Sequence, residues 1–389
     1  MPGPLELEGL PPSRTPRILV ILPQASNYYV DREVFRLVPS HEAVYATDSP
    51  EILSRFREPS EAVAIRFHGP PRALGNSAGA LSRVHKICDL LSRIQPAVVV
   101  TFEVYSVTTD QVARLRKRFG YAHVVASYET TSPTRGLWGV FPVTRLLANR
   151  TASHADLFLA PSGKTRTCLL RVGAPPSRIL PLRLGVFSSE FESARNMTKS
   201  SPRTILYLGA LRRNKGLITL ISGLDRIWSR DHMEDRLVIA GSGPLKGWLE
   251  EQAESRCWLR MEGPVSESRK VELMGGATLF VYPSEDVHLF GFDRWEEQGA
   301  LSVIEAMVAG LPVLGTDSGA LPELVPQGNR IVSQRSPDGL ALAIRELLGD
   351  INSLNELGRR NSVYAGRVFD IQRNASRLGE AIDNLRRAV

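Results

Sequence analysis

The chain has 389 residues, of which 43% are hydrophobic and 23% charged, a composition typical of a soluble globular protein long enough for two domains. No apolar run approaches the roughly eighteen residues that a membrane-spanning helix requires, so a transmembrane protein is excluded. The three cysteines, Cys88, Cys168 and Cys257, are odd in number and widely spaced, which excludes a disulfide framework and indicates a reducing compartment.

The net charge of +7 is unevenly distributed along the chain. Up to Glu190 there are 23 Lys and Arg against 15 Asp and Glu, and the remainder has 25 against 26. The basic excess of the amino-terminal half suits anionic lipid or a phosphorylated substrate, and also an ordinary solubilising surface. The sequence contains no zinc-finger spacing and no aromatic-basic strand motif, so nucleic acid is not an expected partner.

The first part of the chain alternates strand and helix patterns. Residues 1–16 lack the basic and apolar regions of a secretory signal, so we expect a flexible tail and a cytoplasmic protein. Apolar, β-branched runs at 17–23, 97–101 and 123–127 are typical of strands buried on both faces of a parallel sheet, and helical patterns at 81–94 and 109–119 lie between them. Residues 17–195 are therefore predicted to form a doubly wound α/β domain.

A polar, proline-containing stretch at 196–203 predicts a linker. The alternation then restarts and defines a second Rossmann-like domain at 204–365, followed by a carboxy-terminal helix at 366–389, for which packing back on the first domain is one option. Strands are expected at 204–208, 237–240, 279–282 and 313–315, and helices at 216–229 and 301–309. Two such domains facing each other would bind a ligand in the cleft between them, at the carboxyl ends of their strands.

The most specific pattern is the stretch WEEQGALSVIEAMVAGLPVLGTDSGALPE. Glu297 precedes the expected helix and Glu305 lies inside it. Eight helical steps rise roughly 12 Å, which suits the two ends of a sugar nucleotide. Two glutamates on a solvated helix face are the alternative interpretation. Free N–H groups and the dipole at the helix start favour a diphosphate, and the residues assigned to donor binding there are Gln298, Gly299, Ala300 and Leu301.

This E-x7-E pattern, followed by EAM-x-AG-x-PV and SG-x-x-PE, resembles the donor-site signature of retaining glycosyltransferase family four. The stretches LYLGALRRNKG (206–216), LVIAGSGPLKGWL (237–249) and MEGPV (261–265) are similar to further family segments, and the resemblance covers roughly residues 155 to 330. It implies a GT-B fold, with two facing Rossmann-like domains and a cleft between them. It also implies sugar transfer from a nucleoside-diphosphate sugar with retained configuration, as a step of glycan biosynthesis.

The resemblance also implies roles for individual residues. Glu297 would act at the sugar, Glu305 on the ribose, and Lys215 at the diphosphate, where fixed positive charge stabilises the leaving group. A solvated lysine at a helix end is the alternative for Lys215. The remaining donor-side residues are Arg212 as a catalytic group, Arg213, the glycine turn at Gly209, and Val265 beside the nucleobase.

The sequence departs from the family at three places. Ala210 stands where the family has an arginine, for which Arg212 or Arg213 would compensate. Gly299 and Ala300 replace a Phe-Gly pair. Where the family has a catalytic histidine, this chain supplies Glu129, which we assign to the acceptor, with an exposed loop carboxylate as the alternative. The extra segment 285–295, beside the donor loop, would either line the sugar pocket or pack it.

No cofactor is expected. A Mg²⁺ or Mn²⁺ clamp needs closely spaced carboxylates, and Asp-x-Asp occurs nowhere in the chain, so basic side chains and helix starts would replace a metal. An epimerase or phosphorylase of the same fold, and a sugar-nucleotide-binding protein with weakened catalysis, remain alternatives. A nicotinamide oxidoreductase is disfavoured because neither first strand opens into Gly-x-Gly-x-x-Gly.

The sequence does not define the acceptor. A basic stretch at 111–119, QVARLRKRF, predicts a patch that would meet a lipid-linked or otherwise anionic acceptor, with peripheral contact at the inner face of the membrane. The patch consists of Arg114, Arg116, Lys117 and Arg118. A soluble acceptor and an ordinary helix surface are the competing interpretation.

Overall fold

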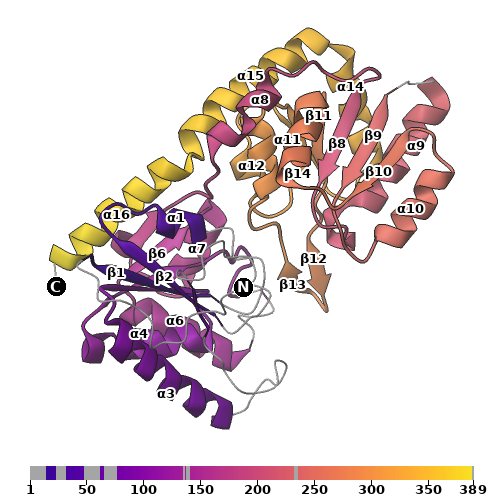
Figure 1. The fold of residues 1–389 in the computed structure, drawn as a ribbon. Helices are drawn as coiled ribbons and strands as arrows, with labels where there is room; N and C mark the ends of the chain where they lie inside the picture. Colours follow the sequence, from indigo (N-terminus) through magenta and orange to yellow (C-terminus); the bar gives the residue numbers. More distant parts are fainter. Residues whose placement is uncertain are drawn as a thin grey trace. The chain divides into compact units, whose positions relative to one another are not determined.

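The computed structural model describes residues 15–22, 32–47, 62–64, 77–134, 136, 141–231 and 235–387. It divides the chain into two compact units (Figure 1). Unit 1 consists of Met1–Gly185 and Ile371–Val389, and unit 2 consists of Val186–Asp370. Of the expected amino-terminal tail, residues 1–14 lie outside the described residues.

Unit 1 contains a seven-stranded sheet in the order β3-β2-β1-β4-β5-β6-β7, and every neighbouring pair is parallel. The order reverses between β1 and β4, as in a doubly wound fold. Valine- and leucine-rich runs form the central strands, which are buried along their whole length. The strands are β1 (Arg17–Ile21), β2 (Glu42–Thr47), β3 (Ala62–Ala64), β4 (Val98–Phe102), β5 (Ala122–Ala126), β6 (Leu157–Ala160) and β7 (Ile179–Pro181).

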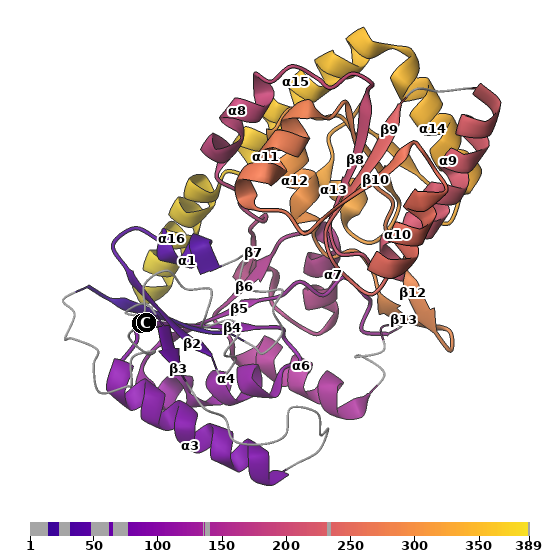
Figure 2. The same cartoon turned by 45° about the vertical axis from the view of Figure 1, so that its right-hand side comes forward.

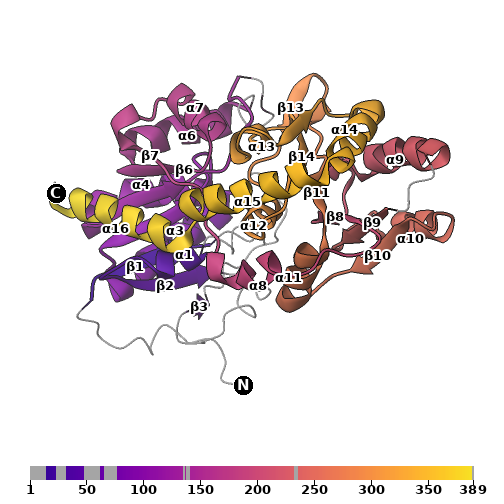
Figure 3. The same ribbon diagram turned by 90° about the horizontal axis from the view of Figure 1, so that it is seen from above.

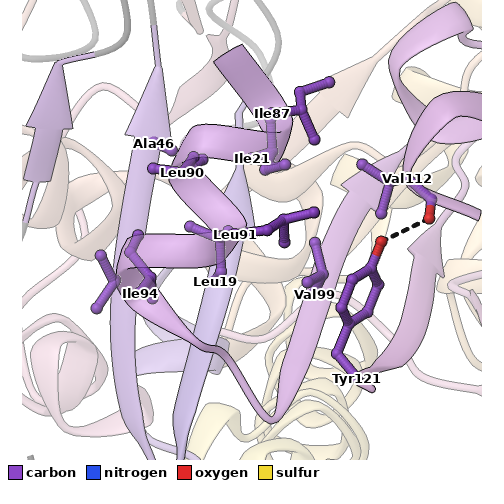
Figure 4. Packing of buried hydrophobic residues seen from close by; sticks show 11 residues of the cluster. Leu19, Ile21, Ala46, Ile87, Leu90, Leu91, Ile94, Val99, Val112 and Tyr121 are labelled. Carbon is purple, nitrogen blue, oxygen red and sulfur yellow. Dashed lines mark hydrogen bonds between the residues drawn. The ribbon is translucent and has the colours of Figure 1, made fainter. Parts of the chain in front are cut away.

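Helices cover both faces of this sheet (Figure 2). Long helices α3, α4 and α6 lie on one face, where Ile87, Leu90 and Ile94 of α3 pack on strands β1, β2 and β4 (Figure 4). Tyr121 closes this cluster and donates its hydroxyl to the Val112 carbonyl at 2.6 Å. The helices of this unit are α1 (Arg32–Arg36), α3 (Ser77–Ile94), α4 (Val107–Phe119), α6 (Pro142–His154), α7 (Gly163–Arg171), the 3-10 turn η4 (Pro176–Arg178) and α16 (Ile371–Arg387).

The last helix of the chain, α16, belongs to unit 1, where it lies beside α1 (Figure 3). Its buried stripe includes Ile371, Leu378 and Ile382. Asn374 anchors it by donating its side-chain amide to the carbonyl of Arg183 at 2.9 Å. The helix expected at 366–389 thus begins later, at Ile371, because residues 366–368 still belong to α15 (Ile351–Val368).

Unit 2 repeats the same design with six parallel strands in the order β10-β9-β8-β11-β14-β15. Helices α9 and α10 lie on one side of the sheet and α11 and α12 on the other (Figures 1 and 2). The strands are β8 (Thr204–Leu208), β9 (Arg236–Ala240), β10 (Leu259–Gly263), β11 (Leu279–Tyr282), β14 (Val313–Thr316) and β15 (Arg330–Val332). The helices are α9 (Leu217–Asp231), α10 (Lys246–Glu254), α11 (Glu267–Gly276), α12 (Leu301–Val308), α13 (Leu321–Leu324), α14 (Pro337–Gly349) and α15 (Ile351–Val368).

A two-stranded antiparallel hairpin, β12 (Val287–Leu289) and β13 (Phe292–Trp295), interrupts this alternation after β11. Its turn residues, Phe290 and Gly291, both have positive φ, at 50° and 80°. The side chain of Phe290 is 91% exposed. The extra segment recognised in the sequence is thus a β-ribbon added to the Rossmann-like design.

The boundary between the units differs from the predicted one at residue 195. The turn η5 (Ser188–Phe191) and the short helix α8 (Glu192–Arg195) belong to unit 2. The reason is packing. The ring of Phe191 is buried, with Nζ of Lys270 5.6 Å from its centre, and Arg195 donates to the Val308 carbonyl at 2.9 Å. In the part of the chain that the structure describes, no helix has the length and apolarity needed to cross a membrane.

Candidate active site

Unit 2 gathers its candidate functional residues at the carboxyl ends of β8 and β11, which are neighbours in the sheet. The strand order reverses there, and open α/β sheets bind ligands at this switch point. Gly216 has φ of 66°, and a Cβ at this position would overlap the carbonyl oxygen of Pro283. A Cβ at Gly241 would likewise overlap the carbonyl oxygen of Gly209. The main chains of the loops after β8, β9 and β11 are therefore in close contact with one another.

Lys215 and Glu297 form a buried ion pair between these loops. Lys215 ends the 3-10 turn η6 (Arg213–Lys215), and Glu297 lies between β13 and α12. Nζ of Lys215 is 2.6 Å from Oε2 of Glu297, and the two side chains are only 12% and 5% exposed. The hydroxyl of Ser284 donates to the same Oε2 at 2.6 Å. This pairing contradicts the alternatives of a solvated lysine and a solvated glutamate.

Aromatic rings enclose the ammonium group of Lys215. Nζ lies 5.1 Å from the ring centre of Tyr282 and 4.7 Å from that of Trp295, distances at which a cation is attracted to a ring face. Tyr282 stacks in turn on Tyr207, with ring centres 5.9 Å apart. Burial raises the pKa of Tyr282 well above its ordinary value, and the Glu297 carboxylate adds to this rise, so the phenol stays protonated. The lysine is thus oriented by one carboxylate and two rings.

The hairpin brings Trp295 into this arrangement, and Asp286 anchors the hairpin at its base. Ser318 donates its hydroxyl to Oδ1 of Asp286 at 2.6 Å, and Gln334 donates its side-chain amide to Oδ2 at 2.9 Å. Oγ of Ser318 also accepts the backbone N–H of Glu297 at 3.3 Å. His288 contacts Asp293 across the hairpin at 3.0 Å rather than the site. Of the extra segment, Trp295 therefore contacts Lys215, whereas His288 and Asp293 pair with each other.

Glu305 is the second buried glutamate, on α12. Oε1 lies 2.5 Å from Nζ of Lys270 on α11, and each side chain is 10% exposed. Although burial lowers the pKa of Lys270, the carboxylates of Glu305 and Glu267 outweigh that effect and raise it. The ammonium group of Lys270 is therefore stabilised in its charged form. This burial again differs from a solvated helix face, and it gives Glu305 a protein partner that the sequence did not suggest.

The segment between the two glutamates begins as loop and continues as helix. Helix α12 begins at Leu301, with Ala300 in the capping position, so only part of the eight-residue step is helical and the predicted rise of roughly 12 Å assumed too much helix. The first N–H groups of a helix have no acceptor within it. Gln298 and Gly299 are half-buried. Gly319, from SG-x-x-PE, lies so close that a Cβ would overlap the backbone of Glu297.

The other predicted donor-side residues lie on neighbouring loops. Arg212 and Arg213 are exposed in the loop after β8, and neither guanidinium forms an ion pair within the described ranges. The backbone N–H of Gly209 donates to the Ala240 carbonyl at 3.0 Å. Val265 is half-buried, directly before Ser266, which caps α11 by accepting from the backbone of Arg269 at 3.2 Å.

Glu129 lies in unit 1, just after β5, and is 7% exposed rather than an exposed loop residue. Its carboxylate accepts the N–H and the hydroxyl of Thr131 at 2.7 and 2.6 Å, and the hydroxyl of Tyr105 at 3.3 Å. Burial raises its pKa, and these hydrogen bonds oppose the rise. Glu103 lies nearby, with φ of 61°, and accepts from Ser127 at 3.0 Å. The carboxyl edge of this sheet thus carries two buried carboxylates.

Sequence reasoning missed several residues that build the site. Tyr282 ends a buried strand, Ser284 is the second residue after it, and Ser318 stands inside SG-x-x-PE. The positions of these three residues therefore carried a usable signal. The position of Lys270 carried no such signal, because a lysine in the helix ESRKVELMGG resembles an ordinary surface residue. Only the fold brings it to Glu305.

Comparison with known proteins relates unit 2 to a family of transferases. Residues 188–362, most of unit 2, match the family model described as glycosyl transferases group 1. Glycogen synthase from Mycobacterium tuberculosis is 31% identical over 179 residues, which are 45% of this chain and 41% of that protein. One subunit of phosphatidylinositol N-acetylglucosaminyltransferase from Arabidopsis thaliana is 23% identical over 274 residues, 68% of this chain and 57% of that protein. The chain thus spans about half the length of these relatives.

The whole chain has the GT-B fold of its structural neighbours. The crystal structure of HepE from Anabaena in complex with UDP has a TM-score of 0.75 at 14% identity and covers 95% of this chain and 100% of that chain. The UDP in that crystal structure is bound to HepE. For this chain, the comparisons define a GT-B protein with two Rossmann-like units, the second of which matches the model of group 1 glycosyl transferases.

Proposed function

We propose that this protein is a glycosyltransferase that moves a sugar from a nucleoside-diphosphate sugar to an acceptor with retained configuration. The observation that carries the proposal is the buried Lys215–Glu297 pair at the switch point, beside the start of α12. The departing diphosphate gains negative charge, which a cation stabilises. The sugar gains oxocarbenium character, which a carboxylate stabilises, so the reaction needs both groups close together. The group 1 match over unit 2 supports the same reaction class.

In this proposal the diphosphate binds at the start of α12. The free N–H groups of residues 299–301 and the helix dipole favour an anion there. Lys215 supplies the fixed positive charge, and the exposed Arg212 and Arg213 supply more in place of the missing arginine at Ala210. The rings of Tyr282 and Trp295 hold the ammonium group in position before the donor arrives, which reduces the cost of organising it during the reaction.

In this proposal the carboxylate of Glu297 stabilises the positive charge that develops on the sugar ring. Lys215 and Ser284 both donate to its Oε2, so they fix the orientation of the carboxylate toward the sugar ring. Glu305 binds the ribose in this proposal, and Val265 supports the base. Glu129 is assigned to the acceptor, whose lipid-linked or otherwise anionic character would bring the enzyme to the cytoplasmic face of the membrane.

A binding screen tests the proposed donor class. We expect one nucleoside-diphosphate sugar of a panel to raise the melting temperature, because a ligand at a hundred times its Kd stabilises the folded state by roughly 2.7 kcal/mol. When that donor is incubated with the protein, chromatography of the products should then detect free nucleoside diphosphate. Release of a changed sugar nucleotide would identify an epimerase instead. Stabilisation by dinucleotides alone would overturn the proposal.

Sugar transfer is also proposed to need no metal. The sequence lacks Asp-x-Asp, and Lys215, the neighbouring arginines and the start of α12 would neutralise the leaving group. We therefore expect slow donor hydrolysis, or transfer, to continue at an unchanged rate after EDTA treatment. Activity that disappears in EDTA and returns with Mg²⁺ or Mn²⁺ would show that a cation carries this charge.

A further inference from the structure

The first turn of α6 in unit 1 exposes three large apolar side chains. Phe141 is 56% exposed, Val143 68% and Leu146 56%. The next two residues of the same helix, Leu147 and Ala148, are buried. We call Phe141, Val143 and Leu146 the apolar turn. A cluster of this kind is unusual on a soluble surface and marks a site of interaction.

The charges exposed on α6 and its neighbour α4 are basic. Arg145 lies in the first turn of α6, and the cations of α4 lie in its last two turns, toward the other end of the same face. Helix α6 contains no acidic residue, and α4, which packs beside it on the same face of the sheet (Figure 2), contains one, Asp110. The carboxylate of Asp110 is buried and paired with Arg114 and Arg150. We call the exposed cations of these two helices the basic flank, which consists of Arg114, Lys117, Arg118 and Arg145.

The structure corrects the patch that the sequence suggested on α4. Arg116 turns away from the basic flank, because it forms an ion pair with Asp156 and only 25% of its side chain is exposed. Arg145 of α6 joins the flank in its place. Cations therefore extend over two helices, with the apolar turn at one end of α6.

We propose that this face of α4 and α6 binds the surface of an anionic lipid bilayer, with the apolar turn inserted among the lipids and the basic flank on the head groups. Amphipathic helices bind membranes through this combination of apolar and cationic side chains. An anionic bilayer complements both features at once, because its head groups carry the charge opposite to the basic flank and its interior is apolar like the inserted side chains. Binding itself does not depend on the proposed reaction.

The fold places the apolar turn at the same edge of the sheet as the proposed acceptor residue. Glu129 follows β5 directly, and α6 starts in the same connection before it runs back toward β6. The first turn of α6 thus lies near the carboxyl edge of the sheet, where Glu129 also lies. If the proposed function is correct, a bilayer at the apolar turn would present a membrane-anchored acceptor to that edge.

Co-sedimentation with vesicles tests the proposal. We expect the protein to pellet with vesicles of phosphatidylcholine and phosphatidylserine in equal parts, to stay in solution with phosphatidylcholine alone, and to dissociate as salt rises. Leu146→Ser should lower the affinity for anionic vesicles about tenfold, because an inserted leucine loses its apolar contact. The matched control is Leu342→Ser on α14, a leucine that is 55% exposed outside this face and should bind as the wild type does.

The charge contribution has its own pair of variants. Replacing Lys117 and Arg118 with alanine should lower anionic-vesicle affinity about 25-fold, since each cation contributes about fivefold. Replacing Arg386 and Arg387, exposed at the end of α16, should have little effect. Vesicle binding that is negligible at low salt, or equal in Leu146→Ser and Leu342→Ser, would overturn the proposal. So would a Leu146-dependent dimer in size-exclusion chromatography without vesicle binding, which would identify a protein interface.

Discussion

Glu297→Gln should lower kcat roughly 10- to 1,000-fold while the affinity for free nucleoside diphosphate stays nearly unchanged. The substitution keeps the shape of the side chain but removes the negative charge beside the developing oxocarbenium ion. Lys215 loses its carboxylate partner at 2.6 Å but keeps the rings of Tyr282 and Trp295. Single-turnover kinetics together with calorimetric titration of the nucleoside diphosphate measure the two quantities separately.

The matched control for this variant is Glu251→Gln, an exposed glutamate on α10. It should retain both turnover and affinity. A Glu297→Gln protein with unchanged kcat would refute a role for this carboxylate in the reaction. If it is merely less stable and equally active, Glu297 serves only as the structural partner of Lys215.

Glu305→Ala should produce the opposite result. If the carboxylate binds the ribose, its loss weakens nucleoside-diphosphate binding by roughly 1.5 to 3 kcal/mol, because a hydrogen bond to a charged group is lost. Turnover at saturating donor should change much less, since the ribose is not altered in the reaction. Titration of the nucleoside diphosphate that the donor screen identifies measures the effect.

The ion pair with Lys270 requires a more selective control. Glu305→Ala leaves Lys270 largely buried with only Glu267 as a carboxylate partner, so affinity could fall through local disorder. The 2′,3′-dideoxy analogue of the nucleotide separates the two causes. Wild type should bind it more weakly than the ribonucleotide, and Glu305→Ala should lose this preference. An unchanged preference in the variant would assign Glu305 to packing with Lys270 alone.

The sequence predicted secondary structure best where a segment has one clear hydrophobic pattern. The apolar runs at 204–208 and 279–282 are strands β8 and β11 with the predicted bounds, because strands buried on both faces cannot tolerate polar residues. The helix after Glu297 was predicted from 301 and begins there. Residues 285–295 were recognised as an extra segment but were not predicted to form the β12–β13 hairpin. The first residue of its turn, Phe290, has a positive φ that favours glycine or asparagine, so the residue type there carried no turn signal.

The candidate site was predictable only in part for a different reason. Glu297, Lys215 and the helix start belong to motifs with fixed spacing, so they could be assigned along the chain. Their partners are set by the tertiary fold. Ser318 reaches the backbone of Glu297 and Lys270 reaches Glu305 from distant elements. The hydroxyl of Tyr105, which donates to Glu129, likewise comes from another loop.

The glycines at the switch point restrict how this site can diversify. At Gly216, Gly241 and Gly319 a Cβ would overlap a carbonyl oxygen of a neighbouring loop, so none of these loops can be reshaped alone without displacing another. Evolution, or a laboratory library aimed at a new sugar, is therefore left with changes of side chain on a nearly constant backbone. Gln298, half-buried in the loop before α12, is a position where a changed side chain would leave these backbone contacts in place.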